Sequence, residues 1–342
     1  MTKVASVGRR FDGLDIFKGL LVLVMVIYHT AGAGVVRYPE LAIFCLRTDP
    51  IHYSFLFVSG FVAGWYYAPR LARSGVSVRR RLRVRAVKLA LLCLLPTAFL
   101  YAVGVRYQWD VFASSFQTPW EAICHMLLSF DGRFLAFEVL LIIALFLVVA
   151  SLVVGRFPTW ALTGCIPAFL ALRPWSLNAS FLAFGFAGLV VGLLWEKGRL
   201  FQARWKTVLA GGSVAFVLVT QTFFTEWHSF VASTGPARGL PVLLTIGSWG
   251  GCAAALASLH GPFLLKKWFL LLGRYSLLGY MTQMLLIHMT FPGFVRLHAS
   301  QVVCFCGTLS VTLVILTVLL AILESARLKW QAVNALYKAV FG

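Results

Sequence analysis

Long apolar stretches recur along the whole of this chain, and they constrain its fold more than any other feature. A helix of about 20 apolar residues spans the hydrocarbon core of a bilayer. Ten stretches come near this length, at roughly 14–34, 51–68, 84–105, 134–154, 158–173, 177–195, 207–225, 239–259, 268–291 and 301–324. With 60% of its 342 residues apolar and 12% charged, the chain lacks the polar surface of a water-soluble globule. We therefore expect an all-α integral membrane protein with about ten transmembrane helices, in which residues 1–342 form a single polytopic domain.

The distribution of positive charge gives an independent test of this arrangement. With a cytoplasmic N-terminus, ten spans place 20 of the 30 Lys and Arg residues in cytoplasmic segments, seven in outer segments and three within helices. This excess is typical of multi-pass proteins of the cell membrane. It predicts that both termini are cytoplasmic, and it accounts for the formal charge of +19 without a nucleic-acid partner. The seven cysteines show no CxxC spacing, so we expect neither a metal site nor a disulfide framework.

Two ionisable residues, Lys18 and His29, lie inside the first apolar stretch. Their spacing amounts to about 1100° of helix, some 20° beyond three full turns, so both side chains fall on one face, roughly 16 Å apart along the axis. Ionisable groups within a membrane helix cost about 2.5–3.5 kcal/mol on insertion scales and usually line a cavity. The pair therefore indicates a working site. The alternative is that Lys18 anchors the helix at the membrane interface and that His29 is a hydrogen-bonded packing residue.

The first stretch also has features of a cleaved signal peptide, because basic residues precede it and the small residues 31–33 follow it. Cleavage there would remove His29. The segment before the apolar run would be unusually long and would contain Asp12, Asp15 and Lys18, which favours a retained membrane helix.

A basic run leads from a predicted cytoplasmic loop after residue 68 into the third apolar stretch. Such runs usually anchor the cytoplasmic end of a membrane helix. Within it, Arg81, Arg85 and Lys88 follow i, i+4, i+7 spacing and would project together from a helix. With Lys18 at the same depth, they would form a cationic stripe suited to the phosphates of an anionic cofactor.

Three other stretches contain polar residues with more than one interpretation. Ser59 lies among small residues in the second stretch, where close helix packing is the default explanation. Glu138 lies one to two turns into the fourth stretch, where it would either act at the site or stay at the membrane interface. In the ninth stretch, Ser276, Tyr280 and Gln283 share a helix face, which indicates a partner helix or a lined cavity.

Four motifs, in this order along the chain, resemble those of the acyltransferase family three membrane enzymes. They are Asp15-Ile-Phe-Lys18-Gly19 followed by His29, Phe57-Val-Ser59-Gly60-Phe61, the basic run from Arg81 to Lys88, and Gly273-Arg274-Tyr275-Ser276-Leu277 with Tyr280 and His288. Lys18 stands where that family frequently has Arg. Gln283 and Met289 stand where a hydrophobic residue and Trp are more usual, and some of these departures resemble the glucan-succinylating branch.

The resemblance implies transfer of an acyl group, acetyl with succinyl as the alternative, from cytoplasmic acyl-CoA to a hydroxyl of a carbohydrate or lipid-linked glycan. His29 would be the general base, since a neutral imidazole with an ordinary pKa of about 6.5 accepts a proton at physiological pH. The other catalytic candidates are Lys18, Glu138, Ser59 and Tyr280, with Ser59, Tyr280 and Arg274 as candidate oxyanion donors. The candidates for binding the acyl-CoA phosphates are Lys18, Arg81, Arg85, Lys88 and Arg274. No permanently bound cofactor is expected, and membrane lipids and a homo-oligomeric partner complete the expected interactions.

Two other functions fit parts of the pattern. A transporter or flippase for a glycan or lipid would use the same intramembrane His and Arg residues as a substrate path, although the sequence shows neither an inverted repeat nor a matched pair of interrupted helices. An N-acyltransferase acting on an amino sugar would differ only in its acceptor. Direct transfer is favoured over a covalent acyl-enzyme, because no activated Ser or Cys pairing is readable.

Overall fold

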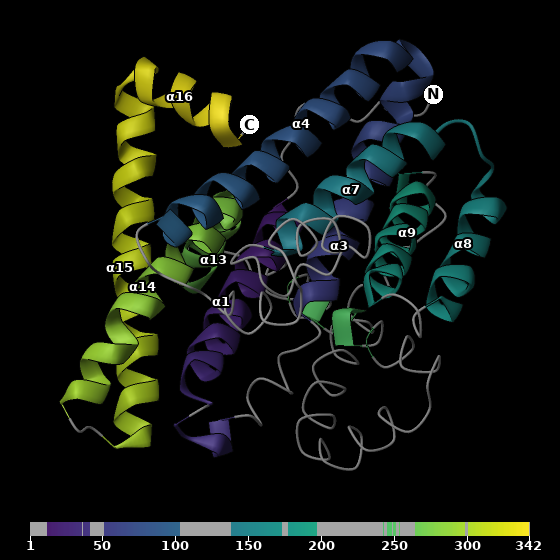
Figure 1. Ribbon diagram of the computed structural model, residues 1–342. Coiled ribbons are helices and arrows are strands. Elements are labelled where there is room, and N and C mark those ends of the chain that lie inside the picture. Colours follow the sequence, from purple (N-terminus) through teal and green to yellow (C-terminus); the bar gives the residue numbers. More distant parts are fainter. Residues whose placement is uncertain are drawn as a thin grey trace. The chain divides into compact units, whose positions relative to one another are not determined.

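The computed structural model (Figure 1) describes residues 12–35, 37–41, 51–102, 138–172, 177–196, 264–297 and 300–341, with a few isolated residues between 242 and 253. Every regular element in this part of the chain is a helix, which confirms the all-α prediction. The apolar stretch at 207–225, and nearly all of the one at 239–259, lies outside the described residues.

Two of the described helices are long and apolar enough to cross a membrane, α1 (Asp12–Gly34) and α15 (Gln301–Lys329). A third candidate span is the pair α13 (Leu264–Arg274) and α14 (Ser276–Arg296), whose axes differ by 89°. Shorter apolar helices lie within the fourth, fifth and sixth predicted stretches. These lengths support association with a membrane.

The surface of α15 explains why this helix suits lipid better than water. Its buried residues form a narrow stripe with a four-residue repeat: Cys304, Thr308, Thr312, Leu316 and Leu320. The rest of the helix exposes apolar side chains such as Val302, Val314 and Val318. A contiguous apolar surface of this kind is unfavourable in water and marks a membrane or protein contact.

One expectation about the second and third stretches is wrong, because no loop follows residue 68. Residues 51–102 are helical throughout and comprise α3 (Ile51–Val62), the π-helix η2 (Ala63–Tyr67) and α4 (Ala68–Ala102). Arg and Leu are good helix formers, and Val78, Leu82 and Ala86 repeat every four residues on the buried side of α4. This amphipathic pattern continues the helix through the basic run, so the arginines stand on a helix.

The ninth stretch, in contrast, is divided between two helices, α13 and α14. At the bend between α13 and α14, α13 packs closely against α1 through glycines. A Cβ on Gly273 would overlap the carbonyl of Asp15, and a Cβ on Gly19 would overlap that of Phe269. This backbone contact holds α13 across α1 instead of in line with α14. An additional amphipathic helix, α16 (Gln331–Phe341), follows α15 and is not predicted by the apolar stretches.

The described helices divide into two compact units. The first unit contains α1, the short 3-10 helix η1 (Pro39–Leu41), α13, α14, α15 and the start of α16. Within it, α1 and α14 run in the same direction. Val22 of α1 faces Gly279 of α14, and further along both helices Gly34 faces Phe291.

In the same unit, α15 runs antiparallel to α14, beside which it lies in Figure 1. Gly307 near the start of α15 faces the ring of Phe294 near the end of α14. Further along α15, the Trp268 indole of α13, which precedes α14 in the chain, donates a hydrogen bond of 2.9 Å to the Thr317 hydroxyl. The first unit is therefore two parallel helices with a third that returns beside them.

The second unit contains α3, η2, α4, α7 (Glu138–Val153), α8 (Thr159–Ala171), α9 (Leu177–Glu196) and the rest of α16. Its tightest contact is between α3 and α9. A Cβ on Gly60 would overlap the carbonyl of Gly185, and one turn further the same holds for Gly64 and the carbonyl of Leu189. Small residues in the second stretch thus allow another helix to approach closely, as predicted, and α3 and α9 run in parallel.

Candidate functional site

The imidazole of His29 lies against the ring of Tyr280 in the first unit. The two ring centroids are 6.2 Å apart with planes tilted by 37°, and Tyr28 approaches His29 edge-on at 5.2 Å. Tyr280 is 5% exposed, whereas His29 is half-buried. The close approach of Val22 to Gly279 explains the contact, because it brings the next residue of α14 towards α1. Two side chains predicted to share a site are thereby neighbours.

Lys18 lies on the same helix as His29 and forms an ion pair with Asp15, one turn before Lys18. Its Nζ is 2.6 Å from Oδ1 of Asp15, and the side chains are 24% and 6% exposed, respectively. Because α1 is unbroken from Asp12 to Gly34, the spacing of Lys18 and His29 keeps them on one face, roughly 16 Å apart. Asp15 was not among the predicted site residues, although its i, i+3 spacing from Lys18 could have indicated it.

Four uncharged polar side chains are buried on the three long helices of this unit: Thr30 on α1, Gln283 on α14, and Thr308 and Thr312 on α15. All are fully buried, and the hydroxyls and the Gln283 amide make no hydrogen bond with the described residues. We call these residues the polar seam. Buried polar groups nearly always have partners, so the seam is suited to hydroxyl groups of a ligand or to water. Of its members only Gln283 was singled out from the sequence.

The two threonines of α15 lie towards the level of Thr30. The Tyr38 hydroxyl, just after α1, is 3.7 Å from the Cys304 sulfur at the start of α15. Thr308 and Thr312 follow Cys304 by one and two turns, roughly 6 and 12 Å along the axis. Since α15 runs back along α1, these hydroxyls approach the depth of Thr30, which adjoins His29 in the sequence.

Arg274, a predicted phosphate ligand and oxyanion donor, is paired with a carboxylate. Its Nη1 is 2.8 Å from Oε1 of Glu324 on α15, and both side chains are about one-third exposed. Beside it, Arg327 donates to the Tyr275 hydroxyl at 3.0 Å and to the Asn334 amide oxygen at 3.1 Å. These contacts join the α13–α14 bend to the end of α15, which indicates a positioning role for Arg274.

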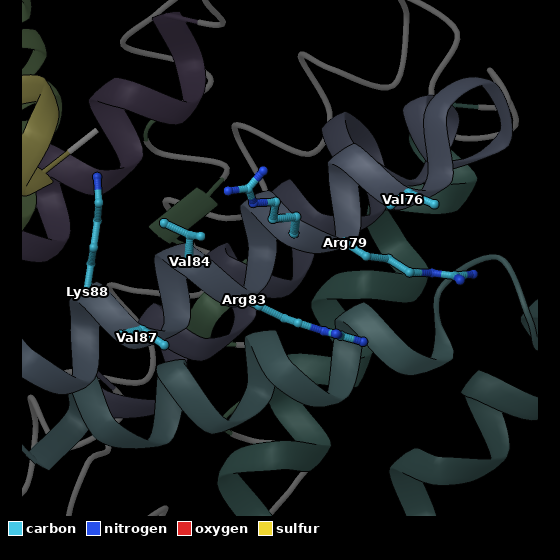
Figure 2. Close-up of a pocket in the computed structure, with 7 residues that line it drawn as sticks. Val76, Arg79, Arg83, Val84, Val87 and Lys88 are labelled. Atoms are coloured by element: carbon cyan, nitrogen blue, oxygen red, sulfur yellow. The ribbon is translucent and has the colours of Figure 1, made fainter.

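The basic run on α4 lines a groove of about 510 Å³ in the second unit (Figure 2). Its lining residues are Val76, Arg79, Arg80, Arg83, Val84, Val87 and Lys88. Of the three predicted phosphate ligands on α4, only Lys88 belongs to this set. Its Nζ also donates to the carbonyl of Lys338 at 3.4 Å. Arg81 and Arg85 are exposed on α4 outside the groove lining.

The two remaining candidates also belong to the second unit. The Ser59 hydroxyl donates to the carbonyl of Phe55 at 2.9 Å, a bond within its own helix. That bond and the glycine packing around it favour the packing interpretation of Ser59. Glu138 begins α7, and its side chain lies outside the described residues.

Comparison of the chain with protein-family models, with curated proteins and with solved structures finds no match in any of the three.

Proposed function

We propose that this protein is an integral membrane acyltransferase that moves an acyl group, acetyl by preference, from acyl-CoA to a hydroxyl of a carbohydrate or lipid-linked glycan. The observation that carries the proposal is the contact of His29 with the buried Tyr280 between two parallel apolar helices. A histidine held beside a phenol in apolar surroundings suits proton transfer more than packing. The four motifs similar to acyltransferase family three support the same chemistry.

The relative directions of helices within each unit agree with the proposed ten spans, whose cytoplasmic termini rest on the distribution of positive charge. In that arrangement the first and ninth spans run outward, and the tenth runs inward. α1 and α14, which are parallel, match the first and ninth, and antiparallel α15 matches the tenth. α3 and α9 belong to the second and sixth spans, which would both run inward, and these two helices are parallel.

In the proposed reaction, His29 takes the proton of the acceptor hydroxyl while the hydroxyl oxygen attacks the thioester carbonyl. The new bond joins that oxygen to the acyl carbon, the carbon–sulfur bond breaks, and the proton passes to the departing CoA thiolate. General base catalysis of this kind contributes about 10²- to 10⁴-fold. The Tyr280 hydroxyl lies on the neighbouring ring and is our candidate donor to the oxyanion.

The phosphates of acyl-CoA need cations that are accessible from the cytoplasm. On α4, the exposed Arg81 and Arg85 are our first candidates, with Lys88 one turn further. Lys18 and Arg274 each face a carboxylate, so their charge is partly balanced and they would contribute less. Acyl-CoA acts as a co-substrate and no resident cofactor is proposed.

A transporter without chemistry is the second candidate, and two observations favour it. The polar seam offers hydrogen-bonding groups inside an apolar helix bundle, and the 89° bend between α13 and α14 resembles the discontinuous helices of transporters. An N-acyltransferase would share every feature of the main proposal except its acceptor.

Purified protein incubated with labelled acetyl-CoA separates these functions. The enzyme should bind and turn over acetyl-CoA, and His29→Ala should lower turnover by 10²-fold or more while CoA binding is retained. His52→Ala, which removes an imidazole from α3, is the matched control and should keep wild-type turnover. A transporter should show neither CoA binding nor turnover, and equal activity of the two variants would refute the role of His29.

A further inference from the structure

Helix α4 turns an apolar face outward. Its buried residues lie on one side of the helix: Leu71, Val78, Leu82, Ala86, Leu89 and Cys93. At about 100° per residue, the opposite side carries Val76, Val84 and Val87, which are 85%, 47% and 59% exposed. The same side continues into Leu91 and Leu95, also exposed. An apolar stripe therefore follows the outward side of α4 for five turns.

Cations flank only the first half of this stripe. Arg79, Arg80 and Arg83 line the groove together with the valines. Figure 2 shows the side chains of Arg79 and Arg83 extending in the same direction from adjacent turns. The Nε atom of Arg79 is buried and makes no hydrogen bond with the described residues. α4 itself contains no acidic residue, so the positive charge of the groove is not balanced within its own helix.

We infer that this groove binds the phosphate of an anionic phospholipid, whose acyl chain lies along Leu91 and Leu95. Guanidinium groups pair well with phosphate, and basic clusters beside membrane helices attract anionic lipids. The exposed valines decide against a merely solvated face, because arginines among aliphatic side chains match the boundary between headgroups and hydrocarbon. The composition of the lining also disfavours a nucleotide, because a base would need neutral hydrogen-bonding side chains and the lining contains only Val, Arg and Lys.

This site differs from the proposed acyl-CoA site in its arginines, although Lys88 borders both. The lipid site uses Arg79 and Arg83, whereas the proposed nucleotide ligands Arg81 and Arg85 lie about 200° around the helix from them. The inference rests on insertion of α4 into a membrane and not on acyl transfer. The two pairs have the same residue type, the same i, i+4 spacing and the same helix, so each is a matched control for the other.

The test compares Arg79→Gln/Arg83→Gln with Arg81→Gln/Arg85→Gln in purified full-length protein. Binding of phosphatidylglycerol is titrated against a phosphatidylcholine background in mixed micelles, and CoA binding is measured separately. Removing two cations near a lipid surface should weaken phosphatidylglycerol binding about 30-fold. The 81/85 variant should stay within about threefold of wild type, and the loss should shrink as salt is raised.

Three outcomes would overturn the inference. Equal weakening by both variants would show a diffuse charge effect, and unchanged binding in both would remove the site. Displacement of phosphatidylglycerol by CoA, with CoA binding lost in the 79/83 variant, would show that the groove is a nucleotide site. Absence of CoA binding to wild type with intact lipid selectivity would refute the proposed function alone. Thermal unfolding of both variants in detergent checks that each is folded.

Discussion

Two sets of charged residues in this molecule differ in how their charge is balanced. In the first unit, Lys18 faces Asp15 and Arg274 faces Glu324. Helix α4 of the second unit contains eight basic residues and no acidic one. Charges that find a counterion within the unit can fix helices in position, while an excess on one helix must be balanced from outside it. The comparison assigns positioning to the first set and ligand binding to the second.

We expect the largest effect from substituting a tightly packed glycine of α13, compared with an openly placed glycine of α4. Gly273→Ala should destabilise the protein by about 3 kcal/mol or more, because the new Cβ would overlap the Asp15 carbonyl and force α13 away from α1. At Gly75 of α4 no atom lies within 4 Å of an added Cβ. Gly75→Ala should therefore stabilise the protein by about 0.5–1 kcal/mol. Thermal unfolding in detergent measures both, and similar values for the two variants would contradict the packing of α13 on α1.

In the first unit, contacts between residues close in the sequence could be predicted, whereas contacts between residues far apart in the sequence could not. The spacing of Lys18 and His29, and the polar face of Tyr280 and Gln283, follow from helical periodicity alone. The Asp15 partner could also have been found, because it lies one turn away. Glu324 could not, since a contact across 50 residues depends on how helices pack.

The bend before α14 could not be predicted from the sequence for a similar reason. The residues on both sides of Tyr275 are apolar enough to continue a single span, and no proline interrupts them. What diverts the chain is the backbone contact of Gly273 with α1, a tertiary effect that overrides local preference. The helix through the basic run of α4, in contrast, could have been predicted. The sequence contains its apolar repeat of every fourth residue, but the many charged residues around it favoured a loop.

The second prediction removes the counterion of Lys18. Asp15→Asn leaves a mostly buried ammonium without its carboxylate and should cost about 2 kcal/mol, less than for a fully buried pair because Lys18 is 24% exposed. If the pair only positions α1, Lys18→Met combined with Asp15→Asn should recover most of that loss. Thermal unfolding measures both, and a double variant as unstable as the single one would show that the charge itself is required.

The third prediction separates stability from function in the polar seam. Gln283→Leu replaces a buried amide that makes no hydrogen bond with the described residues, and it should stabilise the protein by about 1 kcal/mol. Thr317→Val is the control, because that hydroxyl is bonded to Trp268 and to the Leu313 carbonyl, and its loss should destabilise. If the seam binds a substrate hydroxyl, turnover should fall in Gln283→Leu despite the gain in stability. A stabilised and fully active variant would reduce the seam to a packing feature.

The smallest expected effect concerns the pair that we assign to positioning. Arg274→Gln and Glu324→Gln should each cost about 1 kcal/mol or less, because both side chains are about one-third exposed and solvent screens them. A double-mutant cycle should give a coupling energy of about 0.5 kcal/mol, with CoA binding unchanged in Glu324→Gln. If Arg274 instead binds phosphate, freeing it from Glu324 should tighten CoA binding, and Arg274→Gln should weaken it. Tighter CoA binding in Glu324→Gln would show that Arg274 binds phosphate, as we propose for the arginines of α4. Unchanged CoA binding would show that Arg274 only positions the helices.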